Sequence, residues 1–149
     1  MRKILLSVLT TAFVVIAHGA SAGEIAKGTN FTVSADPDGD CKAAACNLKV
    51  TVHALNGFHV NKDYPYKFKA DEAAGVEFQG TDAGGKNVFS KAAGDFKLDP
   101  KDEKLGYMSV RFKAKSGAVK ITGKLKLSVC NEANCQMETQ DLAIPVTVK

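Results

Sequence analysis

The sequence predicts an all-β fold, an immunoglobulin-like antiparallel β-sandwich, and three observations support this. Apolar and polar residues alternate with a period of two through most of the chain after residue 22, which is the pattern of strands with one buried and one solvated face. Turn-forming residues divide the alternation into several short runs. No segment shows a convincing helical period. Short strands at this spacing are typical of the sandwich, and a small barrel is the alternative.

Five alternating segments carry the predicted sheets. In chain order they are NLKVTVHA (47–54), GVEFQG (75–80), MSVRFKAKSG (108–117), AVKITGKLKLSVC (118–130) and DLAIPVTVK (141–149). The fourth segment is the longest. Its apolar phase is expected to face the core, and its polar phase, which runs from Lys120 to Ser128, is expected to face water. Pro145 interrupts the last segment and predicts an edge strand or a bulge, because proline has no N–H for the ladder.

Turn signals separate these segments. The clearest are DPDGD (36–40), NG (56–57), AGG (83–85) and KSG (115–117). Ser116-Gly117 is expected to turn a hairpin between the two strands beside it. The segment ADEAAG (70–75) is compatible with one short helical turn.

The first 22 residues read as a cleaved signal peptide. Arg2 and Lys3 precede an apolar run, Ile4 to Ala17, and the small residues of Ala20-Ser21-Ala22 suit signal peptidase. The apolar run is short for a membrane-spanning helix. Residues 23–149 are then one domain of 149 − 22 = 127 residues. The predicted location is periplasmic or secreted.

The charge of this exported part is close to balanced. The full chain carries 20 Lys and Arg against 16 Asp and Glu, so removing Arg2 and Lys3 leaves 18 against 16, a net charge of +2. The basic residues are spread along the strands and there is no Trp. This distribution argues against a nucleic-acid-binding surface. No cofactor motif stands out.

All four cysteines lie after the predicted cleavage site, at Cys41, Cys46, Cys130 and Cys135. An even number of cysteines in an oxidising compartment predicts two disulfides, for which three pairings exist. We favour Cys41–Cys46 and Cys130–Cys135, because the members of each pair are close in sequence. Cys41–Cys46 is expected to be a local structural staple at the entrance of a strand.

The pair Cys130–Cys135 can be interpreted either as a structural disulfide or as a redox-active one. Closing so small a loop stabilises a fold by roughly 2 kcal/mol in the chain-entropy model, against about 4.6 kcal/mol for a loop of about ninety residues. Cys130 falls on the polar phase of its strand, and a polar turn, Asn131–Asn134, follows it. We therefore expect both sulfurs to lie near the surface, where a partner thiolate can approach for thiol–disulfide exchange.

The residues around this pair resemble a known family. The stretch GKLKLSVCNEANC (123–135), followed by another alternating strand, is similar to the N-terminal domain of the thiol:disulfide interchange protein DsbD. The stretch VTVHALNGFHVNKDYPYKF (50–68) resembles a strand, a turn and the following strand of the same family. The resemblance spans roughly residues 47–148. The chain differs in having Gln136, Met137 and Glu138 where the family often has Tyr-Pro-Pro.

The resemblance implies an immunoglobulin-like periplasmic domain that passes electrons to oxidised periplasmic proteins. Carried over by position, Cys135 is the cysteine that forms mixed disulfides with partners, and Cys130 is the resolving cysteine. The family shields its disulfide with a cap loop, to which residues 81–96 correspond, and Phe89 is the candidate shielding aromatic. Since no thioredoxin-like domain follows in this chain, we expect a separate thioredoxin-like electron donor.

Two other functions stay open at the level of sequence. The first is a non-catalytic sandwich that binds a protein partner and uses both disulfides structurally. The second is a copper(I) carrier, in which Met137 and His59 join the Cys130–Cys135 pair as soft ligands. His59 is otherwise expected to pack or to hydrogen-bond locally, and His53 to be exposed on its strand.

Overall fold

A computed structural model describes residues 23–149, and the signal peptide predicted for residues 1–22 lies outside the described residues. The described chain contains eleven strands and no helix. They are β1 (Gly23–Lys27), β2 (Phe31–Pro37), β3 (Cys46–Ala54), β4 (His59–Val60), β5 (Lys67–Ala70), β6 (Val76–Phe78), β7 (Val88–Ser90), β8 (Phe96–Leu98), β9 (Leu105–Ala114), β10 (Gly117–Cys130) and β11 (Cys135–Val148).

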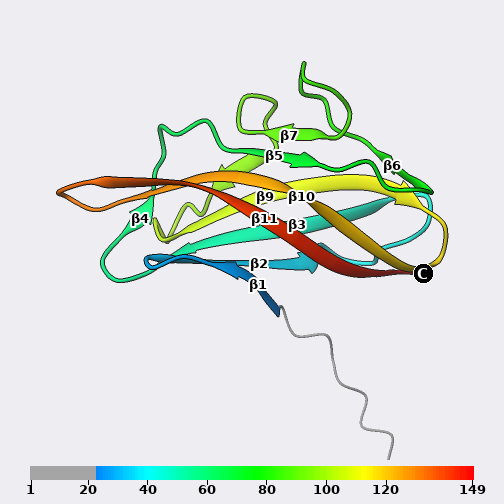
Figure 1. The fold of residues 1–149 in the computed structure, drawn as a ribbon, viewed down its shortest axis with the longest axis horizontal. Helices are drawn as coiled ribbons and strands as arrows, with labels where there is room; N and C mark the ends of the chain where they lie inside the picture. The colour runs from blue at the N-terminus through cyan, green and yellow to red at the C-terminus, as the bar shows by residue number, and fades with distance from the viewer. Residues whose placement is uncertain (1–22) are drawn as a thin grey trace, which may run out of the picture.

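The strands form two antiparallel sheets that enclose one core (Figure 1). One sheet has the order β1-β2-β3-β9-β6, with β8 also paired to β9. The other has the order β11-β10-β5-β7, with β4 also paired to β10. The predicted all-β, immunoglobulin-like antiparallel sandwich is therefore confirmed.

The predicted apolar phases form the core. On β3, Leu48, Val50, Val52 and Ala54 are all fully buried. On β10 and β11, the inward residues are also buried, namely Ile121, Leu125, Leu127, Val129, Leu142, Ile144, Val146 and Val148. Five aromatic rings with no more than 1% exposure fill the space between the sheets, those of Phe31, Tyr66, Phe68, Phe89 and Phe112. Period-two patterning thus predicted the buried faces of the long strands.

The turn at Ser116-Gly117 differs from the prediction. It joins β9 to β10, but these strands do not pair, because β9 belongs to the sheet of β3 and β10 to the sheet of β11. The expected hairpin is therefore wrong, and the turn carries the chain from one sheet to the other. Gly117 has a φ of 126°, in a region that side chains strongly disfavour.

Two other local expectations have clear outcomes. Residues 70–75 contain no helical turn; the N–H of Val76 donates to the carbonyl of Ala73 in a tight turn, where Gly75 has a φ of 76°. Pro145 lies on β11, which is the edge strand of its sheet. The edge position predicted from the proline is confirmed.

Candidate functional site

The candidate site lies at the tip of the long β10–β11 hairpin, which projects at one end of the molecule (Figure 1). The two strands pair along their whole length, from Gly117 opposite Val148 to Cys130 opposite Cys135. The sulfurs of Cys130 and Cys135 are bonded at 1.99 Å. The favoured pairing is therefore present at the place where the ladder ends.

A polar turn of four residues closes the hairpin. The side-chain oxygen of Asn131 accepts hydrogen bonds from the backbone N–H groups of Ala133 and Asn134, each at 2.9 Å. The N–H of Asn131 donates to the carbonyl of Asn134 at 2.9 Å. Asparagine favours this local bonding because its short side chain reaches the backbone two residues on. The turn therefore holds Cys130 and Cys135 opposite each other.

The two cysteines differ in their exposure. Cys135 is exposed, whereas Cys130 is only 6% exposed. The expectation that both sulfurs lie near the surface is therefore wrong for Cys130. A partner can approach the disulfide from the side of Cys135.

The burial of Cys130 comes from a segment that is distant in sequence. β4 pairs with the end of β10, with His59 opposite Cys130 and Val60 opposite Val129. Ser128 was expected on the solvent-exposed face of its strand, but it is fully buried. Its hydroxyl accepts from the Asn61 amide at 3.3 Å, and its carbonyl accepts from the Tyr66 hydroxyl and the Asn61 N–H. This end of β10 is therefore covered on both faces.

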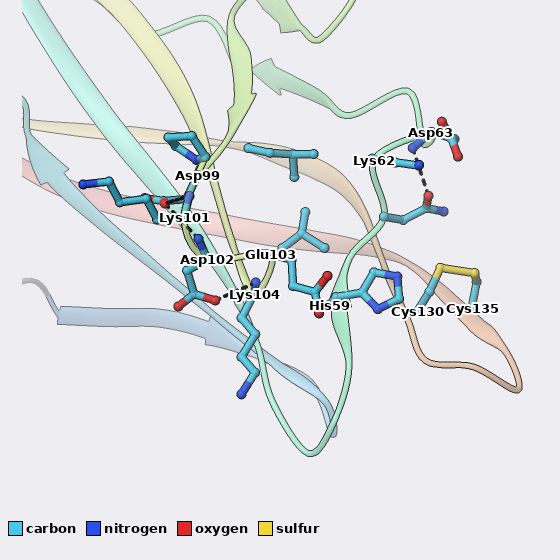
Figure 2. A pocket seen from close by; sticks show the side chains of 14 residues that line it. His59, Lys62, Asp63, Asp99, Lys101, Asp102, Glu103, Lys104, Cys130 and Cys135 are labelled. Carbon is cyan, nitrogen blue, oxygen red and sulfur yellow. Dashed lines mark hydrogen bonds between the residues drawn. A yellow bond between two sulfur atoms is a disulfide. The ribbon is translucent and has the colours of Figure 1, made fainter.

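The register places His59, Cys130 and Cys135 in one row across three strands. Residues directly opposite each other in antiparallel strands project to the same face, with Cβ atoms about 5 Å apart. Figure 2 shows the half-buried imidazole of His59 directed toward the disulfide. The row therefore brings one titratable side chain beside the sulfur pair.

A groove of about 890 Å³ runs beside this row (Figure 2). The disulfide and residues 59–63 line one side, and residues 98–104, from the last residue of β8 to the residue before β9, line the other. Seven charged side chains line it, those of Lys62, Asp63, Asp99, Lys101, Asp102, Glu103 and Lys104. The groove is therefore polar and carries both signs of charge.

Hydrogen bonds to Asp99 organise the far side of the groove. Its carboxylate accepts from the backbone N–H groups of Lys101 at 2.8 Å and Asp102 at 3.1 Å, and from the Tyr107 hydroxyl at 2.9 Å. Bonding to the Lys101 N–H, followed by the Tyr107 hydroxyl, lowers the pKa of the Asp99 carboxyl below its usual range. Asp99 is therefore a structural anion of this loop.

The second disulfide has a different environment. Cys41 and Cys46 are bonded at 1.92 Å and are only 4% and 3% exposed. The N–H of Lys149 donates to the Cys41 carbonyl at 2.8 Å, and the N–H of Ala43 donates to the Lys149 carbonyl at 3.1 Å. This bridge is part of the core and fastens the end of β11, at the opposite end of the molecule from the hairpin tip (Figure 1).

Phe89 does not occupy the place expected of a cap. It is fully buried on β7, opposite Phe68, and its ring packs against Phe78 with centroids 6.3 Å apart. It does not line the groove beside the disulfide. The candidate cap role of Phe89 is therefore corrected, because the ring is part of the core between the sheets.

The remaining side chains singled out in the sequence are dispersed. Met137 lies opposite Ser128 on β11 and is 70% exposed. His53 lies on β3, in the other sheet, and is half-buried. Within residues 23–149, no group of three or more His, Cys, Asp or Glu side chains is placed to hold a metal ion.

From the sequence, His59 joins Cys130 and Cys135 only in the copper(I) alternative, and neither the strand pairing that forms the row nor the far wall of the groove was predicted. The strand β4 has only two residues, too few for an alternating pattern to show. The only available signal was the histidine just after the Asn56-Gly57 turn. A single histidine after a turn does not indicate which strand its own segment pairs with.

No protein-family model matches this chain, and no curated protein matches it. One solved structure, AggA, the major subunit of aggregative adherence fimbriae type I from Escherichia coli, is similar with a TM-score of 0.38 and 12% identity, over 85% of this chain and 99% of that chain. A similarity this low has no bearing on the function.

Two further observations concern location. Both disulfides are formed, which indicates an exported protein, since disulfides persist in oxidising compartments. Among residues 23–149 no helix has the length and apolar character needed to cross a bilayer.

Proposed function

We propose that this protein is a periplasmic thiol–disulfide interchange protein that uses Cys130 and Cys135. It takes electrons from a separate thioredoxin-like donor and passes them to oxidised periplasmic proteins. The resemblance to the N-terminal domain of DsbD motivates this proposal. Cys135 is the cysteine that partners attack, and Cys130 is the one that leaves and later resolves.

The observation that carries the proposal is the contrast between the two disulfides. Cys135 is exposed beside a groove, whereas Cys41 and Cys46 are both buried in the core. Exchange requires a thiolate to approach one sulfur in line with the bond. Only the disulfide at the hairpin tip offers a sulfur for this approach within the described residues.

The proposed reaction transfers two electrons. The donor thiolate attacks Sγ of Cys135, the disulfide breaks, and its electron pair leaves on Sγ of Cys130. The donor's second thiolate then attacks the donor sulfur of the mixed disulfide and releases Cys135 as a thiolate. The donor is oxidised to a disulfide, and Cys130–Cys135 is reduced to two thiols. Cys135 repeats the attack on a client disulfide, and Cys130 resolves the product.

Equilibration in dithiothreitol redox buffers tests the proposal, with peptide mapping to follow each disulfide separately. We expect Cys130–Cys135 to have a potential above about −300 mV, in the range of exchange proteins, and Cys41–Cys46 to lie below it. The buried disulfide is the internal control. If Cys130–Cys135 also resists reduction, both bridges are structural, and the non-catalytic binding module becomes the better account.

Trapping in the native compartment tests the assigned roles. The variant Cys130→Ala leaves the exposed Cys135 without its resolving partner, so mixed disulfides with other proteins should accumulate on non-reducing gels. The matched control is Cys135→Ala, which leaves the buried Cys130 and should trap much less. Equal trapping by both variants, or none by either, would contradict the assignment.

A further inference from the structure

We infer that His59 stabilises the thiolate of Cys130 that is released when the disulfide opens. This inference rests on the proposed exchange function and names the group that acts on the leaving sulfur. His59 lies directly opposite Cys130 in the β4–β10 pair, and Cys130 lies directly opposite Cys135. The imidazole is therefore on the same face as both sulfurs and next to the buried one (Figure 2).

The buried position of Cys130 creates the need for such a group. The side chain is 6% exposed, and burial away from water disfavours a thiolate. A poorly stabilised thiolate is a slow leaving group in exchange. A neighbouring donor of a hydrogen bond or a proton offsets this effect.

His59 is the titratable side chain that the register brings to Cys130. The charged side chains of the groove beside it come from two segments: Lys62 and Asp63 after β4, and Asp99, Lys101, Asp102, Glu103 and Lys104 between β8 and β9. None of these seven residues is paired with Cys130 in the sheet. Histidine is also the side chain whose charge changes between pH 5 and 8, where thiol exchange operates.

His59 donates to the leaving sulfur in one direction of the exchange and accepts its proton in the other. As the incoming thiolate forms its bond to Sγ of Cys135, the electron pair of the broken bond moves to Sγ of Cys130. The imidazolium N–H donates a hydrogen bond to this thiolate, or transfers its proton to give the thiol and neutral imidazole. In the reverse direction, imidazole accepts the proton of the Cys130 thiol as Cys130 attacks to resolve a mixed disulfide.

The titration of Cys130 tests the inference. In the Cys135→Ala background Cys130 is a free thiol, and thiolate absorbance at 240 nm follows its ionisation while Cys41–Cys46 stays oxidised. We expect the midpoint to rise by about one pH unit on adding either His59→Ala or His59→Gln, since an opposite charge nearby lowers a pKa by about 1–3 units. His59→Lys, which places a positive charge at this position, should have the same midpoint as the background with His59 intact.

His53→Ala is the matched control, because His53 lies on β3 in the other sheet. It should leave the midpoint unchanged. A midpoint that is unchanged in His59→Ala and His59→Gln, both folded by circular dichroism, would overturn the role of His59. A rise in Ala and Gln without rescue by Lys would also overturn it, because it would indicate a loss of packing and not of charge.

The two proposals fail in different measurements. If Cys130–Cys135 of the unmodified protein resists reduction by dithiothreitol, the exchange function fails whatever the titration shows. If the disulfide is reducible but the Cys130 midpoint does not respond to His59, only the inference about His59 fails.

Discussion

The residue that most clearly links the core to the candidate site is Tyr66. Its ring is fully buried and stacks on Phe96, with centroids 3.9 Å apart, and its hydroxyl donates to the carbonyl of Ser128, two residues before Cys130. Burial raises the pKa of the Tyr66 hydroxyl above its ordinary value. Tyr66 therefore stays neutral and hydrogen-bonded in the folded state across the ordinary pH range.

We predict that Tyr66→Phe lowers the free energy of unfolding by about 1 kcal/mol at pH 7, the typical value of one hydrogen bond. Above about pH 10 the tyrosine of the unfolded chain ionises while that of the folded protein does not. The wild type is therefore destabilised as the pH rises, whereas the variant has no hydroxyl at position 66 to ionise. The difference in the free energy of unfolding between the two should shrink by pH 11. Urea denaturation at both pH values measures it. A difference that stays constant or grows would contradict the prediction.

At the scale of elements, the close approach of β5 to β10 orients the strand that carries Cys130. The two strands pair from Ala70 opposite Gly123 to Lys67 opposite Lys126. A Cβ on Gly123 would overlap the Lys69 carbonyl oxygen and would lie 2.8 Å from Cα of Ala70. Only glycine therefore allows this spacing of the two backbones.

We predict that Gly123→Ala lowers the free energy of unfolding by about 2 kcal/mol, because backbone atoms must move to admit the methyl group. Gly23→Ala is the matched control, since a Cβ on Gly23 has no neighbour within 4 Å, and it should change stability by less than about 0.5 kcal/mol. Thermal or urea unfolding of both variants compares them. Equal changes in the free energy of unfolding would mean that the backbones of β5 and β10 move apart at Gly123 with no loss of stability, which would contradict the prediction.

At the scale of the whole molecule, two disulfides of equal loop length lie in different environments. Each joins cysteines with a sequence separation of 5. The chain-entropy model therefore assigns roughly 2 kcal/mol to each. The sulfurs of Cys41 and Cys46 also pack in the core, whereas Cys135 is exposed.

We predict that the double substitution Cys41→Ala/Cys46→Ala lowers the free energy of unfolding by about 4 kcal/mol, and that Cys130→Ala/Cys135→Ala lowers it by about 2 kcal/mol. The excess arises because both cysteines of the Cys41–Cys46 pair are buried, whereas Cys135 of the hairpin pair is exposed, and a buried cysteine contributes apolar packing that alanine does not replace. Urea denaturation of the two double variants gives the comparison. If the hairpin pair costs as much as the buried pair, or more, the bridge at the tip would have a mainly structural role.

The sequence predicted the regular part of the sandwich well. The alternation of Leu48, Val50 and Val52 identified a buried face because a strand turns its side chains to opposite faces at every residue. Pro145 identified an edge because it lacks a donor. The pairing of the two disulfides was predicted from the short sequence separation of their cysteines, since cysteines a few residues apart around a turn are held close together.

The sequence did not predict contacts between distant segments. Ser116-Gly117 has the composition of a hairpin turn, but local residues do not determine which sheet the next strand joins. Ser128 and Cys130 lie on a polar phase, yet they are buried because β4 and the segment after it cover them. Phe89 had the right chemistry for a cap but packs between the sheets.

By itself, therefore, the sequence determined the fold class, the faces of the long strands and the disulfide partners. These depend on neighbours within about ten residues, which the chain geometry brings together in any compact state. Only the tertiary structure decided that Cys135 is open while Cys130 is covered, and that His59 lies beside them. These features depend on the pairing of segments some seventy residues apart, which packing of the whole chain selects and local pattern does not encode.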